Sequence, residues 1–589
     1  MTPRAWYPLT GAVLRTRGGA VRAEKTPVPI DPLASPRLAL AGRVVTMDDA
    51  FTVRDHATVY MEAGRIVAIR DAAEAAPPGF ERVDVVATGG TLFPGLIELH
   101  NHLSYNALPL WERVPKLFLH RGQWPDHKDY RRLVSGPMTV VGEHRDDEGR
   151  PSLLPALVRY VECKSLMGGV TTTQGVKLAS NSGIQRFYRG IVRNVEQTDD
   201  PELPEAQGRI PDVDARNARR FLTRLEREDS CMLLHLSEGV TDPADPESRA
   251  RRHFRALEIA AGTWALNDRF TGIHAAGLLP EDFDVLASHR ASIVWSPFSN
   301  LLLYGGTARV EAAAAAGVRI GLGSDWSPTG SKNLLGELKV AWLYSQHLLG
   351  GVLGARDIVA MATRDAARIL KWESTLGTLE AGRRADVLVV TGTAGDPYEA
   401  LVRARETDVR LVMINGIARY GAVDLMDALG PRGEAVRVGG EERRLFLEQH
   451  TADPDVAPVT LRTAQRTLRE AFRNIAALAR EAERPRAARL RRALDAPVAP
   501  VWSLALDEIR DTGVDLRPRL PFDGPRDFTG PERVSRRAAM AIRSTPLSQI
   551  LGPIELDPLT VADDHDFLSF VERQPNVPEP VRLGLRELY

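Results

Sequence analysis

The sequence predicts an α/β protein built on a (β/α)8 barrel, with a small composite β-sandwich domain from both flanks and a mostly helical C-terminal extension. Two observations favour this class. Short β-rich segments stand on both sides of a long central region, and within that region strand-like runs alternate with helical patterns. The expected boundaries are residues 1–92 and 376–429 for the two halves of the β domain, 93–375 for the barrel and 430–589 for the extension.

The flanking segments resemble each other in pattern. Residues 38–71 contain two runs rich in β-branched residues, broken by Gly42 and Gly64, which are each suited to a tight turn. Short strands punctuated by glycine return at residues 377–390 and 409–421. Because a small sheet must cover its apolar face, we expect the two halves to meet in space as one domain.

The central region, about residues 93–370, has the length and alternation of a barrel of about 250 residues. A helical stretch at residues 310–317 is rich in alanine and ends at Gly317, a natural C-terminal stop. Strand, helix, strand is the order that a parallel sheet requires. The expected strands are LIELHNH, GGVTTTQG, CMLLHL, TGIHAAG, ASIVWSP and VRIGLGSD.

Beyond residue 429 the chain becomes rich in proline and arginine. One amphipathic helix is expected there, because apolar residues recur on a single helical face: Leu461, Leu468, Phe472, Ile475 and Leu478. We expect the extension to cover the barrel or to pack on a second subunit, and the alternative is a lid that shapes the active site.

Composition excludes several classes of protein. A chain of 589 residues with 43% apolar side chains can bury a large core without cross-links, and Cys163 and Cys231 have no partners at metal-ligand spacing. The net charge of -1 gives no general attraction to nucleic acid or to membranes. No run approaches about 18 uninterrupted apolar residues. We therefore expect a soluble, cytoplasmic protein with neither nucleic acid nor membrane as a partner.

The strongest local signal is FPGLIELHNH, in which His100 and His102 end a strand. Side chains two apart on a strand point the same way, so both imidazoles can enter the barrel mouth and share one ion. An H-x-H pair alone is weak evidence. It gains weight because polar residues also follow three other strand-like runs, and barrel enzymes assemble their sites at the carboxyl ends of strands.

These residues are His235 in CMLLHLSEG with Glu238 three positions later, His274 in TGIHAAGL, and Asp325 after VRIGLGS. A neutral imidazole suits zinc or iron, and a carboxylate that is not a ligand can move protons between water and substrate. Taken alone, His274 fits a buried core histidine and Asp325 fits a helix cap.

The order H-x-H, H-x-x-E, H, D along one α/β segment resembles the amidohydrolase superfamily, and within it the metal-dependent deaminase and chlorohydrolase branch that includes guanine deaminase and the triazine hydrolases. The resemblance covers residues 38–421 and includes GGVTTTQG, the SPFSN segment before Leu301 and LGTLEAGRRADVLVV. It implies a TIM barrel and a small-molecule substrate. We expect a homo-oligomer, with a dimer as the first choice.

The resemblance also implies a role for each matching position. One divalent metal ion, zinc first with iron or manganese as alternatives, would be held by His100, His102, His235 and Asp325. Glu238 would be the proton shuttle. His274 would contact the attacking water or the substrate, with direct ligation as a second choice. Lys177 is the one lysine to check as a bridge between two metals, and one metal is favoured.

The implied chemistry is hydrolysis of C–N bonds other than peptide bonds. Activated water would attack an electrophilic carbon, Asp325 would accept its proton, and Glu238 would protonate the leaving nitrogen. Deamination of a nitrogen heterocycle is the first expectation. Ring opening of a cyclic amide needs the same groups and stays open, as does a non-catalytic scaffold with the same fold.

One position departs from the resemblance. Family deaminases often have a histidine just before the SPxSN-like segment, where this chain has Trp295. We expect an aromatic wall there in place of a polar substrate contact. Tyr105 and Trp111, in the loop after His102, are expected to bind a planar substrate with it. Packing beneath the loop is the equally open alternative for these side chains and for Asn106 and Trp124.

Overall fold

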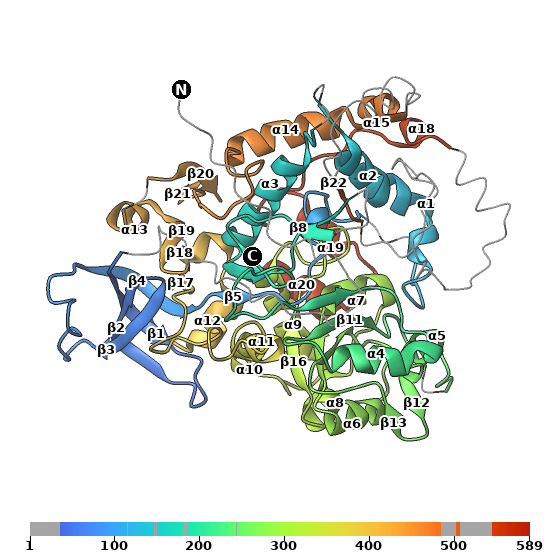
Figure 1. The fold of residues 1–589 in the computed structure, drawn as a ribbon, viewed down its shortest axis with the longest axis horizontal. Helices are drawn as coiled ribbons and strands as arrows, with labels where there is room; N and C mark the ends of the chain where they lie inside the picture. The colour runs from blue at the N-terminus through green and yellow to red at the C-terminus, as the bar shows by residue number, and fades with distance from the viewer. Residues whose placement is uncertain are drawn as a thin grey trace, which may run out of the picture.

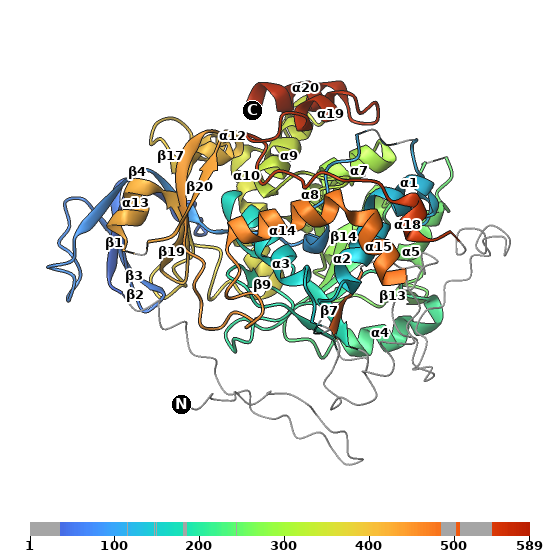
Figure 2. The same ribbon diagram turned by 90° about the horizontal axis from the view of Figure 1, so that it is seen from above.

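The computed structural model describes residues 36–483, 502–506 and 545–589, apart from residues 113, 115, 147, 149, 181–184, 243 and 431. The first 35 residues of the predicted β domain and much of the predicted extension therefore lie outside the described residues. The chain has an α/β fold, with a sheet on one side and a larger region of strands and helices beside it (Figures 1 and 2).

Both flanks of the chain contribute to one nine-stranded sheet. Strand β4 joins the flanks, since it pairs parallel with β1 and antiparallel with β17. The sequence predicts a β-sandwich, whereas these hydrogen bonds connect all nine strands into a single sheet. The strands are β1 (Leu38–Val45), β2 (Val53–Glu62), β3 (Arg65–Asp71), β4 (Val85–Pro94), β17 (Val387–Thr391), β18 (Val409–Ile414), β19 (Ile417–Ala422), β20 (Glu434–Val438) and β21 (Glu441–Leu445).

The sheet continues past residue 429, where the sequence predicts a helical extension to begin. Strands β20 and β21 form a hairpin on its edge. Gly439 and Gly440 both have positive φ, at 55° and 84°, as a tight two-residue hairpin turn requires. The run EERRL in β21 carries four charged residues and lacks the apolar alternation by which strands are recognised.

Eight central strands run parallel to their neighbours: β5 (Leu96–Ile97), β6 (Val170–Thr173), β9 (Arg193–Asn194), β10 (Gln207–Arg209), β11 (Met232–Leu236), β14 (Phe270–His274), β15 (Ser292–Trp295) and β16 (Arg319–Leu322). They form a three-stranded and a five-stranded sheet. A bond from Ala206 N to Val195 O links β9 to β10, and one from Asp325 N to His100 O links β16 to β5. Each of the six predicted runs contains a strand.

Most connections between these strands contain helices: α2 (Gly136–Glu143), α3 (Leu154–Met167), α4 (Ala218–Leu225), α5 (Arg249–Arg255), α6 (Pro280–Ser288), α7 (Pro297–Tyr304) and α8 (Val310–Ala315). Three more helices follow β16: α9 (Leu334–Leu348), α10 (Ala355–Met361) and α11 (Arg364–Leu370). Between β6 and β9, β7 (Lys177–Ser180) pairs with β8 (Gln185–Phe187) instead. Shorter elements are α1 (Lys128–Tyr130), α12 (Pro397–Arg403), α13 (Val423–Ala428), β12 (Glu258–Ala260) and β13 (Thr263–Trp264).

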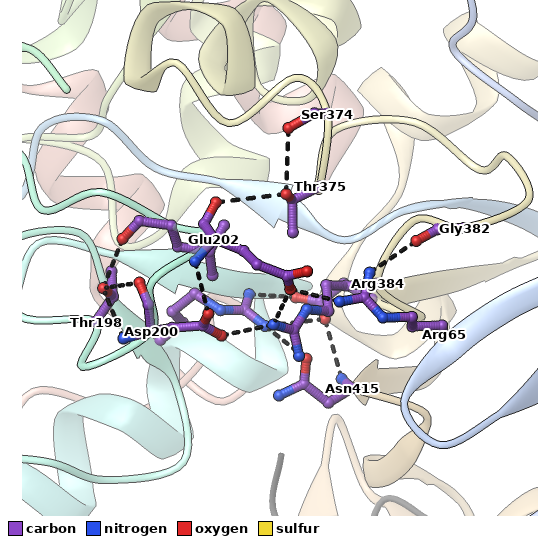
Figure 3. Close-up of polar contacts among 12 residues, drawn as sticks. Arg65, Thr198, Asp200, Glu202, Ser374, Thr375, Gly382, Arg384 and Asn415 are labelled. Carbon is purple, nitrogen blue, oxygen red and sulfur yellow. Dashed lines mark hydrogen bonds and ion pairs between the residues drawn. The ribbon is translucent and has the colours of Figure 1, made fainter. Parts of the chain in front are cut away.

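Ion pairs connect the nine-stranded sheet region to the central strands (Figure 3). Arg384 pairs with Asp200 at 2.7 Å and with Glu202, which also pairs with Arg65 of β3. Nearby, Arg193, the first residue of β9, pairs with Asp386 at 2.6 Å. Arg384 and Asp386 are buried, so this network fixes how the two regions meet.

The C-terminal part packs around the central region (Figure 2): α14 (Leu461–Arg473) lies on α3, and α20 (Glu579–Leu588) lies on α9. The predicted amphipathic helix is present but is divided at Asn474 into α14 and α15 (Ile475–Glu483). The remaining elements are β22 (Trp502–Leu504), α18 (Leu547–Ile550) and α19 (Phe567–Glu572), of which β22 pairs with β7.

Residues 545–589 also hold the loop that follows β5. The side-chain amide of Gln574 donates to the carbonyls of Trp111 and Glu112 at 3.0 Å and accepts from Val114 N at 3.1 Å. Asp557 is buried with two lysines, pairing with Lys332 at 2.7 Å and with Lys164. Burial lowers the pKa of Lys164 to about 8, and Asp557 acts in the opposite direction.

Replacing Asp557 should destabilise the protein strongly. Asp557→Asn leaves Lys164 and Lys332 buried without their shared carboxylate, and breaking a buried pair in this way typically costs about 3–5 kcal/mol. The unfolding midpoint in urea measures the effect. As a control, Glu74→Gln removes a half-exposed pair with Arg70 and should cost less than about 1 kcal/mol. Equal midpoints for both variants would contradict this account of the extension.

Two absences concern the described residues alone. None of their helices is both long and apolar enough to cross a membrane. Cys163 and Cys231 are both buried free thiols.

Candidate metal centre

Four histidines from three separate strand ends surround one small volume. The ring of His100, after β5, has its centroid 4.9 Å from that of His102, 4.8 Å from His235 and 4.9 Å from His274. The Nε2 atoms of His102 and His235 are 3.2 Å apart. His100, His235 and His274 are buried, so their nitrogens meet in a space with little access to water.

Asp325 places a carboxylate against two of these rings. Its Oδ1 lies 3.2 Å from Nε2 of His100 and 3.5 Å from Nε2 of His102. Ligand atoms about 2.0–2.1 Å from a tetrahedral zinc ion are about 3.3 Å from one another. The observed separations match that spacing.

Hydrogen bonds at the far side of two rings leave the near nitrogens available. Nδ1 of His100 lies 3.3 Å from Oε1 of Gln174, which also accepts from Asn101 N. Nδ1 of His235 lies 3.4 Å from the carbonyl of Arg209. Because these oxygens can only accept, each Nδ1 carries the proton and each Nε2 keeps its lone pair. Nε2 of His100 is buried without a hydrogen-bond partner.

The protonation states of the histidines and of Asp325 also suit metal binding. Burial lowers the pKa of His100, His235 and His274, so these imidazoles are neutral, which is the form that binds a metal. Burial acts to raise the pKa of Asp325, but its interaction with the histidines, His100 above all, is stronger and lowers that pKa. Asp325 is therefore a carboxylate.

The donor set fits a divalent metal ion. Two overlapping groups of three have their ligand atoms within 4.8 Å of one another, one made of His100, His235 and His274 and the other of His100, His102 and Asp325. Imidazole nitrogen with one carboxylate oxygen is a combination that zinc binds in catalytic sites. The orphan Nε2 of His100 would gain a partner in such a complex.

Glu238 stands beside this group. Its Oε2 is 3.6 Å from Nε2 of His274, and its Oε1 accepts a 2.6 Å hydrogen bond from Tyr304. Trp124, in the single turn Trp124–Asp126, donates in turn to the Tyr304 hydroxyl at 3.0 Å. Burial raises the pKa of Glu238 to about 7. A carboxyl group with that pKa can both hold and release a proton near neutral pH.

Helix α7 bonds to three different groups of the centre. Ser299 donates to Asp325 Oδ2 at 2.6 Å, the Asn300 amide nitrogen is 3.0 Å from His274 Nδ1, and Tyr304 bonds to Glu238. The start of the helix is held by a bond from Phe298 N to Glu337 at 3.0 Å. A single short helix therefore orients these three side chains.

The backbone is unusual at two of the same residues. His274 and Asp325 have φ of 69° and 65°, in the left-handed region that non-glycine residues rarely adopt. This conformation costs on the order of 1 kcal/mol per residue. Strain of this kind gathers at functional sites, where the surrounding structure imposes it.

Comparison with known proteins points to one family. The model of the family described as "Amidohydrolase family" matches residues 237–418, which include Glu238, His274 and Asp325. The resemblance predicted from the sequence is confirmed.

Two curated proteins with similar sequences are matched over different shares of their length. A "5-methylthioadenosine/S-adenosylhomocysteine deaminase" of Desulforudis audaxviator is 26% identical over 420 residues, which are 67% of this chain and 94% of that protein. An "S-triazine hydrolase" of Gordonia rubripertincta is 31% identical over 194 residues, 31% of this chain and 39% of that protein.

Among solved structures, an adenosine deaminase from Xanthomonas campestris, crystallised with bound zinc, matches with a TM-score of 0.50 at 20% identity. The match covers 67% of this chain and 94% of that one. A triazine hydrolase variant matches with the same TM-score at 22% identity, over 65% of this chain and 94% of that one. These likenesses concern the fold.

The structure brings together all six residues predicted for the metal and the chemistry: His100, His102, His235, Glu238, His274 and Asp325. Lys177 lies on β7, which pairs with β8 and β22 and not with the eight central strands. The side chain that projects toward His100 after β6 is that of Gln174 instead.

Trp295 does not fit its predicted role as a wall of the substrate pocket. Val294 packs with Leu233 and Ile273 in one apolar cluster, while Trp295, the next residue of β15, belongs to another. Successive side chains of a strand point to opposite faces. The fully buried indole lies 6.0 Å from the ring of Tyr344 in α9.

The other two predicted substrate residues lie in different surroundings. The ring of Tyr105 is 6.3 Å from that of His102 and 5.0 Å from that of Trp326. Trp111 is buried against His127, at 6.3 Å. Tyr105 is therefore beside the centre, and Trp111 supports the loop, which is the packing alternative left open for it.

Sequence reasoning missed several residues that hold the site. Gln174 and Ser299 lie in the quoted segments GGVTTTQG and SPFSN, shortly after the strands β6 and β15, and a polar residue at such a strand end is a signal that could have identified them. Glu98, within LIELHNH, accepts from Asn101 Nδ2 at 2.8 Å and from Ser324 N at 3.2 Å. Trp326 follows Asp325 directly, and nothing in its spacing marked it.

Gly323 should tolerate no side chain. An added Cβ would lie 2.6 Å from the backbone nitrogen and oxygen of His100, which are closer than real Cβ atoms come. Gly323→Ala should therefore displace His100 and abolish stoichiometric zinc binding, measured by elemental analysis after gel filtration. Gly552→Ala is the control, since no atom lies within 4 Å of its added Cβ. Zinc content equal to that of the unmodified chain in Gly323→Ala would refute the assignment.

Proposed function

We propose that this chain is a metal-dependent hydrolase acting on C–N bonds other than peptide bonds, and that it deaminates a nitrogen heterocycle. One observation carries the proposal. Nε2 of His102 lies 3.2 Å from Nε2 of His235 and 3.5 Å from Asp325 Oδ1, which is also 3.2 Å from Nε2 of His100, and Glu238 stands beside this group at His274. The resemblance to deaminases along 94% of a curated relative supports the choice of reaction.

The ligands of one zinc ion would be His100, His102, His235 and Asp325. His100 and His235 support this assignment, because their Nδ1 atoms face oxygens that can only accept a proton. When bound, zinc lowers the pKa of water from 15.7 toward 7 and so makes a hydroxide nucleophile available near neutral pH. Asp325, held by Ser299, is placed to orient the attacking water.

Glu238 transfers the proton that the leaving nitrogen requires. Tyr304 must accept from the Trp124 indole, which can only donate, so its own hydroxyl proton goes to Glu238 Oε1. A proton on the Glu238 carboxyl group is then carried by Oε2, the oxygen that faces His274.

The substrate we propose is planar. An aromatic group stands beside His102, with Trp326 at 5.7 Å from that ring, 5.0 Å from Tyr105 and 5.5 Å from Trp124. Aromatic faces of this kind favour flat ring systems through stacking and edge-to-face contact. Tyr105 is retained as a substrate residue.

We also propose that the eight central strands close into a (β/α)8 barrel with the metal centre at its carboxyl end. The bonds from Ala206 to Val195 and from Asp325 to His100 join the two parallel sheets at both edges, which supports closure. In the division that we propose, the β domain from both flanks extends to β21 rather than ending at residue 429.

The function is tested by metal removal and substrate survey. The zinc-loaded chain should release ammonia from at least one of a panel of purines, pterins and triazines, and dialysis against a chelator should abolish the release until zinc is restored. Cyclic ureas and amides complete the panel, because ring opening without ammonia would favour the alternative reaction. A chain that neither binds zinc nor acts on any member would refute the proposal.

Loss of a ligand should remove both metal and activity. His235→Ala and Asp325→Ala take away one of four proposed ligands each, and we expect turnover to fall at least about 1,000-fold with loss of stoichiometric zinc. His347→Ala, on an exposed turn of α9, is the matched control and should keep both. Retained zinc and turnover in the two ligand variants would contradict the assignment.

Glu238→Gln should separate chemistry from metal binding. The amide cannot donate and accept the proton that the leaving nitrogen requires, so kcat should fall about 100- to 10,000-fold while bound zinc is unchanged. Steady-state rates with parallel zinc analysis measure this. Full activity of the glutamine variant would assign the proton transfer to another group.

A further inference from the structure

A buried chain of hydrogen bonds leads from the strand β15 to the far side of His274. The indole nitrogen of Trp295 donates to Thr307 Oγ1 at 2.7 Å, and Thr307 Oγ1 donates to Asn300 Oδ1 at 3.2 Å. The amide nitrogen of Asn300 lies 3.0 Å from His274 Nδ1. All four side chains are buried.

The first member fixes the direction of the whole chain. An indole N–H can only donate, so Thr307 must accept from Trp295 and direct its own hydroxyl proton to Asn300. That bond requires the Asn300 oxygen to face Thr307, which turns the NH2 group toward His274. The Nδ1 atom of a neutral His274 must then accept, and the ring proton resides on Nε2.

This arrangement is the reverse of the one at two neighbouring rings. His100 and His235 have an acceptor oxygen at Nδ1, which leaves Nε2 without a proton, whereas His274 has a donor at Nδ1. His274 nevertheless lies in one of the two groups able to hold a metal. Distance alone therefore does not separate a ligand from a donor here, but the hydrogen bonds do.

We propose that Trp295, Thr307 and Asn300 are positioning residues that fix His274 as the Nε2-protonated tautomer, so that it acts as a hydrogen-bond donor toward the reacting centre and not as a metal ligand. The inference rests on the proposed function for the use of that donor. Nε2 of His274 lies 3.6 Å from Glu238 Oε2, and the N–H therefore points to the place where the proton transfer occurs.

The departure at Trp295 gains a physical reason in this way. The resemblance places a histidine at this position, and a histidine can donate or accept according to its tautomer. An indole has no acceptor nitrogen, so it permits only one direction along the chain to His274. Trp295 thus acts on His274 through Thr307 and Asn300, without lining the substrate pocket.

Histidine nitrogen NMR of the full chain tests the tautomer without metal or substrate. Spectra of the 15N-histidine-labelled, zinc-free protein at a pH where the rings are neutral show which nitrogen carries the proton, and His274→Gln assigns the signal. We expect the Nε2 proton in the unmodified chain. Asn300→Asp, which replaces the donor by an acceptor, should move the proton to Nδ1, and Trp295→Phe should give a mixture of the two forms.

Trp372→Phe is the matched control. Its indole is also fully buried and donates at 2.9 Å, but to the carbonyl of Pro204, outside this chain of bonds. It should leave the His274 signal unchanged. A proton on Nδ1 of His274 in the unmodified chain would overturn the proposal, as would an unchanged tautomer in both Asn300→Asp and Trp295→Phe. If either Asn300→Asp or Trp295→Phe fails to fold, the remaining variant together with Thr307→Val still tests the tautomer of His274.

Zinc affinity and kinetics separate positioning from ligation. Asn300→Asp should bind zinc no more weakly than the unmodified chain in chelator competition, while kcat falls about 100-fold, as expected for loss of one donor to the reacting centre. Thr307→Ser should retain activity and Thr307→Val should lose it. Weakened zinc binding in Asn300→Asp would identify His274 as a ligand and overturn the inference. Because the NMR result needs no turnover, a failure of the proposed function would be seen separately.

Discussion

The metal centre depends on one constraint: the side chains of four histidines and Asp325 share one small volume, in which Nε2 of His100, Nε2 of His235 and the Asp325 carboxylate present lone pairs to one another. Such an arrangement is unfavourable unless a cation fills the space, since buried acceptors without donors lose hydration and gain nothing in return. The surrounding residues hold Nε2 of His102 3.2 Å from Nε2 of His235, and hold Asp325 Oδ1 3.2 Å from His100 and 3.5 Å from His102, against that cost.

The holding groups act from the far side of each ligand. Gln174 behind His100 and Ser299 behind Asp325 each satisfy one atom and so determine which other atom is left for the centre. Helix α7 is the common support, and Glu337 fixes its start by a bond to Phe298 N. Glu337 is fully buried, and this burial raises its pKa to about 8.

The C-terminal residues also support the segments that position the metal centre. Gln574 holds the backbone of the loop that follows β5, and Asp557 neutralises two buried lysines beneath it. The ion pairs around Arg384 tie the nine-stranded sheet to the other side of the central strands. Segments far apart in sequence therefore keep the strand ends in register with one another.

Residue patterns alone were enough to predict the class of fold and the candidate ligands. The alternation of strand-like and helical runs located six of the central strands. The histidines of H-x-H and H-x-x-E could be recognised as candidate ligands because they stand at the ends of predicted strands. These patterns could not reveal Trp295 as a buried donor, Tyr304 and Ser299 as supports, or the hairpin β20–β21, because those facts depend on which residues become neighbours. Hydrogen-bond direction, and with it the difference between His274 and the two histidines His100 and His235, exists only once donors and acceptors from distant segments are in contact.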